Sequence, residues 1–142
     1  MKYDKLIRSG CSGVYAAPRL VGPLRAAAKR AGVAWQDLDL AGVTGGEAFF
    51  QRCAEVFSLP GYFGHNWDAL HECMLDFAGR GTLGAVVHWR RGTALAQRAP
   101  EVVQTALEIL QDAARYWASS GRVFLVIVDR DSVRGVDLPP LR

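Results

Sequence analysis

Three carboxylates recur at every fourth position in the middle of the chain: Asp68, Glu72 and Asp76. On an α-helix this spacing places the three side chains on one face. Like charges four residues apart destabilise a helix, and no lysine or arginine within residues 61–78 offsets them. The pattern leaves two interpretations open: an ordinary solvated face, or a surface that binds a cationic partner.

Two histidines near these acids suggest an alternative function, that of a metal-dependent enzyme. His65, Asp68, His71 and Glu72 supply the nitrogen and oxygen ligands that a divalent metal uses. However, His65 precedes the predicted start of the helix, and His71 and Glu72 point about 100° apart around it. An exposed helix face also lacks the cleft that shifts a catalytic carboxylate's pKa. We therefore expect no metal, no cofactor and no catalysis, and a metal-dependent enzyme is the less favoured alternative.

The acidic face belongs to a helix that is predicted to begin after Asn66, a favourable N-cap residue. The other side of this helix is apolar and should pack on the core; it consists of Trp67, Leu70, Cys73, Met74 and Phe77. A glycine-bracketed loop over residues 59–64 precedes the helix and contains Tyr62 and Phe63. Aromatic side chains of this kind anchor many protein interfaces.

The remaining elements follow from the periodicity of the apolar residues. Helices are expected over residues 20–31, 47–57, 93–97 and 101–119, and strands over residues 12–16, 35–41, 83–89 and 122–129. Thr44 and Glu47 have the spacing of a capping box, and residues 1–10 are expected to be a frayed start. Strands separated by helices need crossover connections, so the sequence predicts an α/β fold: a small parallel β-sheet of three or four strands covered by helices.

Composition limits the class of protein and its partners. The 142 residues have a net charge of +3, but residues 61–78 carry −3, which leaves +6 on the remainder. A basic chain that gathers acids on one helix does not present that helix to RNA, so we expect no direct nucleic-acid binding. No apolar run reaches the about 18 residues that span a bilayer, and no signal peptide is evident. We expect a cytoplasmic protein that makes no membrane contact.

Residues 59–74 (LPGYFGHNWDALHECM) closely resemble the signature of the barstar family, intracellular inhibitors of microbial ribonucleases such as barnase. In that family a Leu-Pro loop leads through an aromatic pair, a glycine and Asn-x-Asp-Ala-Leu into the inhibitory helix. Residues 86–90 (VVHWR) are similar to a family strand that ends in Trp-Arg. The resemblance implies one domain, 1–142, with a strand–helix extension (1–34), a barstar-like core (35–129) and a C-terminal tail (130–142).

The resemblance also implies a mechanism and a set of partner-binding residues. The acidic helix and the loop before it would dock into a ribonuclease active site, with Tyr62 against the enzyme. Asp68 matches the first inhibitory aspartate, and Glu72 takes the place of the central aspartate that mimics the substrate phosphate. The predicted partner-binding set is Tyr62, Phe63, Gly64, His65, Asn66, Asp68, His71, Glu72, Leu75 and Asp76.

The expected partner is a cationic protein, a secreted microbial ribonuclease, against which this chain would act as an immunity protein. The chain departs from the family pattern where Glu72 replaces an aspartate and His71 replaces a tryptophan. Near the position of a further family acid in the last helix, this chain has Ala114 or Arg115. A barstar-fold binding module for a partner other than a ribonuclease is therefore an open alternative.

Overall fold

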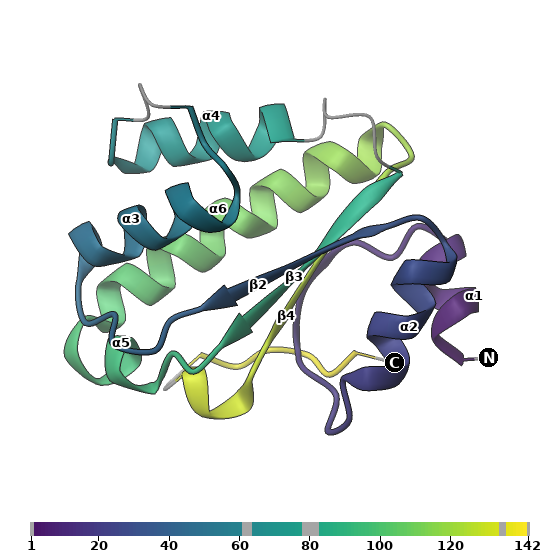
Figure 1. The fold of residues 1–142 in the computed structure, drawn as a ribbon, viewed down its shortest axis with the longest axis horizontal. Helices are drawn as coiled ribbons and strands as arrows, with labels where there is room; N and C mark the ends of the chain where they lie inside the picture. The colour runs from purple at the N-terminus through teal and green to yellow at the C-terminus, as the bar shows by residue number, and fades with distance from the viewer. Residues whose placement is uncertain (1, 61–63, 78–82, 134–135, 142) are drawn as a thin grey trace.

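The computed structural model describes residues 2–60, 64–77, 83–133 and 136–141 (Figure 1). Its elements in chain order are α1 (Lys2–Arg8), β1 (Gly13–Ala16), α2 (Gly22–Arg30), β2 (Ala34–Asp39), α3 (Gly46–Val56), α4 (Trp67–Phe77), β3 (Gly84–Arg90), α5 (Thr93–Arg98), α6 (Pro100–Ser119), β4 (Val123–Val128) and a 3₁₀ turn, η1 (Arg130–Ser132).

The four strands form one parallel sheet in the order β1-β4-β3-β2. The predicted α/β class and parallel sheet are thereby confirmed. Helices cover both faces: α3, α4 and α6 lie on one side, and α1 and α2 lie on the other (Figure 1). Every residue of β4 is buried, which explains why residues 123–128 read as an unbroken apolar run.

Two hydrophobic clusters fill the space between the sheet and its helices. On β3, Val87 and Trp89 face the cluster beneath α3, α4 and α6, whereas Val86 faces the cluster beneath α2. This alternation follows from the two-residue period of a strand. Trp117 of α6 is fully buried in the first cluster, where its ring lies 5.0 Å from that of Phe124.

The prediction of a frayed start at residues 1–10 was wrong. Lys2–Arg8 forms α1, which packs against α2 and buries Ile7. Asp4 accepts two hydrogen bonds of 2.9 Å from the Arg30 guanidinium, an ion pair that lowers the pKa of Asp4. A seven-residue helix is too short to show a clear period, and these contacts with α2 stabilise it.

The C-terminal residues also pack onto the sheet. The Ala16 N–H donates to the Pro139 carbonyl at 2.8 Å, and Leu141 is buried in the cluster that contains Ile7. These residues therefore form an edge segment beside β1. The two ends of the chain contact the same side of the sheet, as Figure 1 shows.

The predicted capping box before α3 was also wrong. The N-cap is Gly45, which makes no side-chain cap hydrogen bond, and the helix begins at Gly46. Thr44 lies one position too early to act as the N-cap. Gly45 instead provides only its carbonyl, which accepts from the Phe49 N–H at 3.0 Å.

The three cysteines are free thiols and differ in burial. Cys53 of α3 is 1% exposed, and burial raises the pKa of its thiol, so the thiol stays protonated. We expect iodoacetamide to label the half-buried Cys11 and Cys73 well before Cys53, as followed by mass spectrometry of the folded protein. Labelling of Cys53 at the rate of the other two would contradict the packing of α3.

Candidate protein-binding site

The start of α4 is fixed by Asn66, as predicted. Its side-chain oxygen accepts from the Ala69 N–H at 2.8 Å, and its carbonyl accepts from the Leu70 N–H at 3.0 Å. Its amide nitrogen donates to the Gly64 carbonyl at 3.2 Å. These hydrogen bonds pair backbone groups that would otherwise have no partner at the start of a helix. The first turn of α4 therefore has a defined orientation.

Replacing Asn66 with alanine should therefore lower the free energy of unfolding by about 1 kcal/mol, because the first turn loses its side-chain acceptor. Urea denaturation measures the change. Asn66→Asp is the matched control, since aspartate keeps an acceptor oxygen at the same position. Equal stability of the alanine and wild-type proteins would contradict the role of this cap.

The two faces of α4 are separated as predicted. Asp68, Glu72 and Asp76 are exposed, whereas Leu70 and Met74 are 1% and 0% exposed. Trp67 and Cys73 are half-buried against the core. The side chain of Phe77, which was predicted to face inward, lies outside the described residues.

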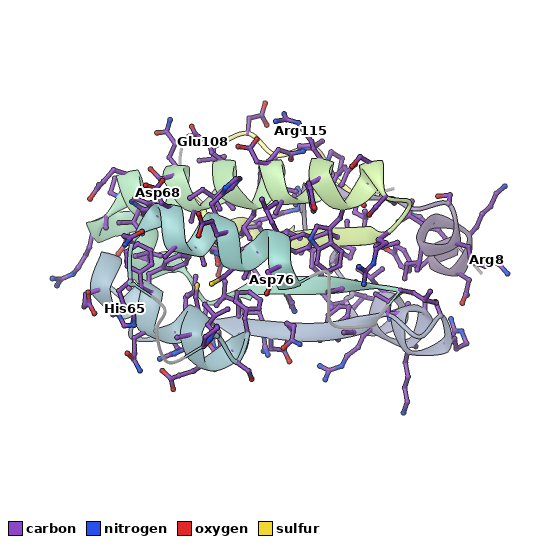
Figure 2. All side chains as sticks on the ribbon, turned by 90° about the horizontal axis from the view of Figure 1, so that it is seen from above. Arg8, His65, Asp68, Asp76, Glu108 and Arg115 are labelled. Carbon is purple, nitrogen blue, oxygen red and sulfur yellow. The ribbon has the colours of Figure 1, made fainter. Side chains whose placement is uncertain are left out.

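The three carboxylates of α4 differ from several other acids of the protein in their surroundings. None of them forms an ion pair with another residue that the structure describes. By contrast, four aspartates elsewhere each pair with an arginine: Asp4, Asp37, Asp39 and Asp112. The exposed face of α4, which we call the acidic face, consists of Asp68, Glu72 and Asp76, and two of these are labelled in Figure 2.

The core holds α4 in place at both ends. At its start, the Trp67 ring packs against Phe50 of α3 with centroids 4.7 Å apart. Near its end, the Met74 carbonyl accepts a 3.1 Å hydrogen bond from the buried indole N–H of Trp117. A partner that binds the acidic face therefore meets a preorganised helix, which reduces the ordering cost of binding.

The other predicted partner-binding residues differ in their exposure and in their contacts with the rest of the protein. Gly64 is exposed, and His71 and Leu75 are half-buried on α4. His65 contacts α3, because its Nδ1 lies 2.8 Å from a carboxylate oxygen of Glu47. Tyr62 and Phe63 lie outside the described residues.

The described residues give the metal-dependent alternative no geometric support. Within them, no group of three or more histidine, cysteine, aspartate or glutamate side chains is placed to hold a metal ion. The Nδ1 atom of His65 is directed at Glu47, which belongs to a different helix from the proposed ligands Asp68 and Glu72.

Helix α6 packs against α4 and carries an exposed aromatic side chain, Tyr116, that was not among the predicted site residues. The Gln111 side chain accepts from the Val14 N–H at 3.2 Å, which shows which side of α6 faces β1. Helical spacing places Ile109 and Tyr116 on the opposite side of α6 from Gln111. Tyr116 is 55% exposed, a high value for an aromatic residue, and so offers aromatic contact area on the surface of α6. The signal in the sequence was that Tyr116 lies off the apolar face of this helix, which carries the buried Val103, Leu107, Leu110 and Trp117.

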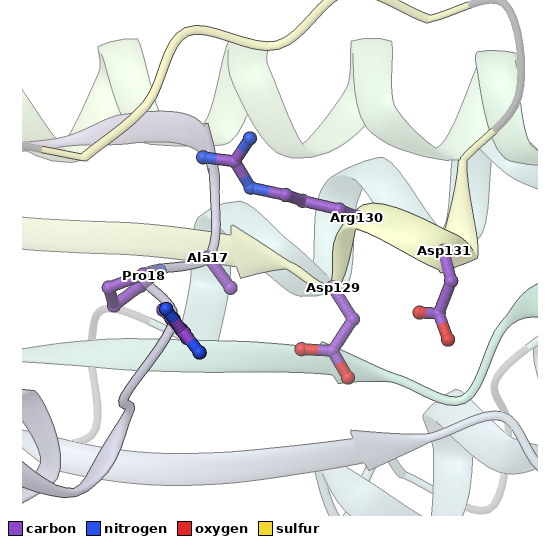
Figure 3. A pocket seen from close by; sticks show the side chains of 6 residues that line it. Ala17, Pro18, Asp129, Arg130 and Asp131 are labelled. Atoms are coloured by element: carbon purple, nitrogen blue, oxygen red, sulfur yellow. The ribbon is translucent and has the colours of Figure 1, made fainter.

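A separate cavity of about 580 Å³ lies at the carboxyl ends of β1 and β4, away from α4 (Figure 3). Two arginines and two aspartates line it, together with Ala17 and Pro18: Arg19, Arg130, Asp129 and Asp131. Asp129 also binds the buried His88, whose Nε2 is 2.8 Å away. The cavity has no excess of either charge and does not extend the acidic face.

No helix in the described residues is long and apolar enough to cross a membrane. A comparison with curated proteins gave no match. A family model, Barstar (barnase inhibitor), matches residues 34–129, a segment that runs from β2 to the end of β4 and contains α4. That family consists of non-enzymatic inhibitor proteins. Because the match covers more than half of the 142 residues, the chain belongs to the barstar family.

Proposed function

We propose that this protein inhibits a ribonuclease by placing the acidic face of α4 in the active site of the enzyme. The proposal rests on one observation: three exposed carboxylates, unpaired within the described chain, on a helix that the core holds in position. A ribonuclease holds RNA phosphates with cationic side chains, and carboxylates offer those side chains charge-assisted hydrogen bonds of the same kind. The acidic face would then exclude the substrate.

In this proposal the acidic side chains contribute unequally to binding of the ribonuclease. Asp68 and Glu72 are the two principal contacts, one helical turn apart, and Asp76 is a weaker third contact. Tyr62 and Phe63 of the preceding loop would add aromatic contact area on one side. Gly64, His65, Asn66, His71 and Leu75 complete the proposed partner-binding set, and Tyr116 extends it onto α6.

Electrostatic attraction between the acidic face and a cationic enzyme would also accelerate association. Salt screens exposed charges over about 10 Å at 0.1 M ionic strength. The association rate constant should therefore fall as the salt concentration rises, while the dissociation rate constant changes less.

The proposed setting follows from the family. Proteins of the barstar family are intracellular, so we propose a cytoplasmic inhibitor that neutralises a microbial ribonuclease made by the same cell. No catalytic step belongs to this chain, since inhibition needs only occupancy of the enzyme's active site.

A titration tests the proposal. Purified protein is added in steps to a barnase-type ribonuclease, and cleavage of a fluorogenic RNA is followed at each step. We expect activity to fall linearly to zero at one inhibitor per enzyme, as for tight binding. Full ribonuclease activity at a large excess of this protein would contradict inhibition of that class of enzyme.

A further inference from the structure

The charges of this protein are divided between two parts of the chain. Residues 1–33, which precede the family match, contain seven lysines and arginines and one aspartate, a net charge of +6. The remaining residues, 34–142, carry 10 basic and 13 acidic side chains, a net charge of −3. All seven basic side chains of the first part are exposed. The N-terminal region therefore gives the molecule a basic surface.

This basic surface and the acidic face lie on opposite sides of the sheet. Helices α1 and α2 cover one face of the sheet, and α4 lies on the layer that covers the other (Figure 1). The two surfaces therefore cannot meet within one molecule. A contact between these two surfaces therefore requires two molecules.

A groove on the basic surface has the features of a helix-binding site. Its volume is about 480 Å³, and it runs between α2 and the start of β2; it is lined by Gly22, Arg25, Ala26, Lys29, Val33 and Trp35. The small side chains of α2 leave room for another backbone to approach. Trp35 is half-buried and provides an aromatic wall, with the Arg25 guanidinium 5.5 Å from its ring centroid. Its two cationic side chains, Arg25 and Lys29, suit a helix that presents carboxylates.

The cations of this groove match the spacing of the acidic face. Arg25 and Lys29 are four residues apart on α2, as Asp68 and Glu72 are on α4, and this spacing corresponds to about 6 Å along each helix axis. Lys29 forms no ion pair with another residue that the structure describes. Arg25 lies 3.4 Å from Asp37, but its side chain is 59% exposed and has five N–H donors, so it can also bind a second carboxylate.

We propose that the groove formed by α2 and Trp35 binds the acidic face of α4 of a second copy of this protein. The contact joins different surfaces of the two copies, so it is heterologous and can add further copies head to tail. Spacing and charge favour this occupant, because an acidic helix with carboxylates four residues apart is present on every copy. If α4 also binds a ribonuclease, which rests on the proposed function, self-association and inhibition compete for the same face.

Sedimentation velocity without any ribonuclease tests this proposal, so its outcome is independent of inhibition. In about 0.02 M sodium chloride the weight-average sedimentation coefficient should rise with protein concentration, and in about 0.3 M it should return to the monomer value. Arg25→Gln/Lys29→Gln removes one surface, and Asp68→Asn/Glu72→Gln removes the other. Each double variant alone should remain monomeric at low salt.

Mixing the two double variants gives the sharpest outcome. Only one intact pair of surfaces remains in the mixture, so it should form 1:1 dimers and nothing larger. Dimers in the mixture also show that both variants are folded. The matched control, Arg98→Gln/Arg130→Gln, removes the same charge from exposed arginines outside the groove and should associate like the wild type.

Three results would overturn the proposal. The first is a wild-type protein that stays monomeric at low salt. If that monomer binds added RNA or anionic vesicles, the basic surface has a different partner from the one proposed. The second is undiminished association of Arg25→Gln/Lys29→Gln. The third is a mixture of the two double variants that contains only monomers.

Discussion

Replacing Asp68 and Glu72 together with alanine should abolish inhibition of the ribonuclease and leave the stability of the protein close to that of the wild type. Truncating one partner of a buried interfacial charge pair costs about 2–5 kcal/mol, so the double variant should bind roughly a thousandfold more weakly or worse. Stability should change little, because both side chains are exposed and two effects offset each other. The change removes a repulsion of about 0.2–0.5 kcal/mol, and it also removes the favourable interaction of Asp68 with the N-terminus of α4, about 0.3–1 kcal/mol. Inhibition titrations and urea denaturation measure the two effects.

The matched control for this variant is Glu108→Ala/Asp112→Ala on α6. These acids are also exposed and four residues apart, so the net charge changes equally (Glu108 is labelled in Figure 2). The control should inhibit within a few-fold of the wild type. Unchanged inhibition by the α4 double variant, or an equal loss in the α6 control, would show that the acidic face is not the specific contact.

Replacing Trp117 with alanine should lower the free energy of unfolding by about 3–5 kcal/mol. The residue is 0% exposed, so truncation leaves a large cavity in the main cluster. The change also removes the indole donor that binds the Met74 carbonyl, and this bond anchors the end of α4 to α6. A loss of this size is a large fraction of the 5–15 kcal/mol that stabilises a typical domain. Urea denaturation measures it.

Tyr116→Ala provides the neighbouring control, because this side chain is 55% exposed. It should change stability by less than about 1 kcal/mol and, if Tyr116 extends the docking surface, should weaken inhibition. A Trp117→Ala protein as stable as the Tyr116→Ala protein would contradict the described packing of α4 against α6.

Much of the architecture could be predicted because local sequence signals agreed with the final packing. The apolar run at residues 123–128 corresponds to a strand covered on both faces. The N-cap at Asn66 and the division of α4 into an acidic face and an apolar side follow from side-chain chemistry and helical spacing alone.

The features that were missed depend on contacts between distant parts of the chain. Helix α1 is stabilised by the ion pair of Asp4 with Arg30 and by burial of Ile7, neither of which has a local signal. The edge segment at Pro139 binds β1, more than 120 residues away. Likewise, the contact of His65 with Glu47 depends on how the segment before α4 packs against α3.

Hydrogen exchange of the inhibitor–ribonuclease complex shows whether α4 is the contact surface, because it locates the contact without any substitution. A barnase-type ribonuclease is added to the deuterium-exchanging protein, and protection is mapped by mass spectrometry. We expect added protection in peptides that cover residues 64–77, with little change in those that cover α1 and α2. Added protection confined to α1 and α2, with residues 64–77 exchanging as in the free protein, would contradict it.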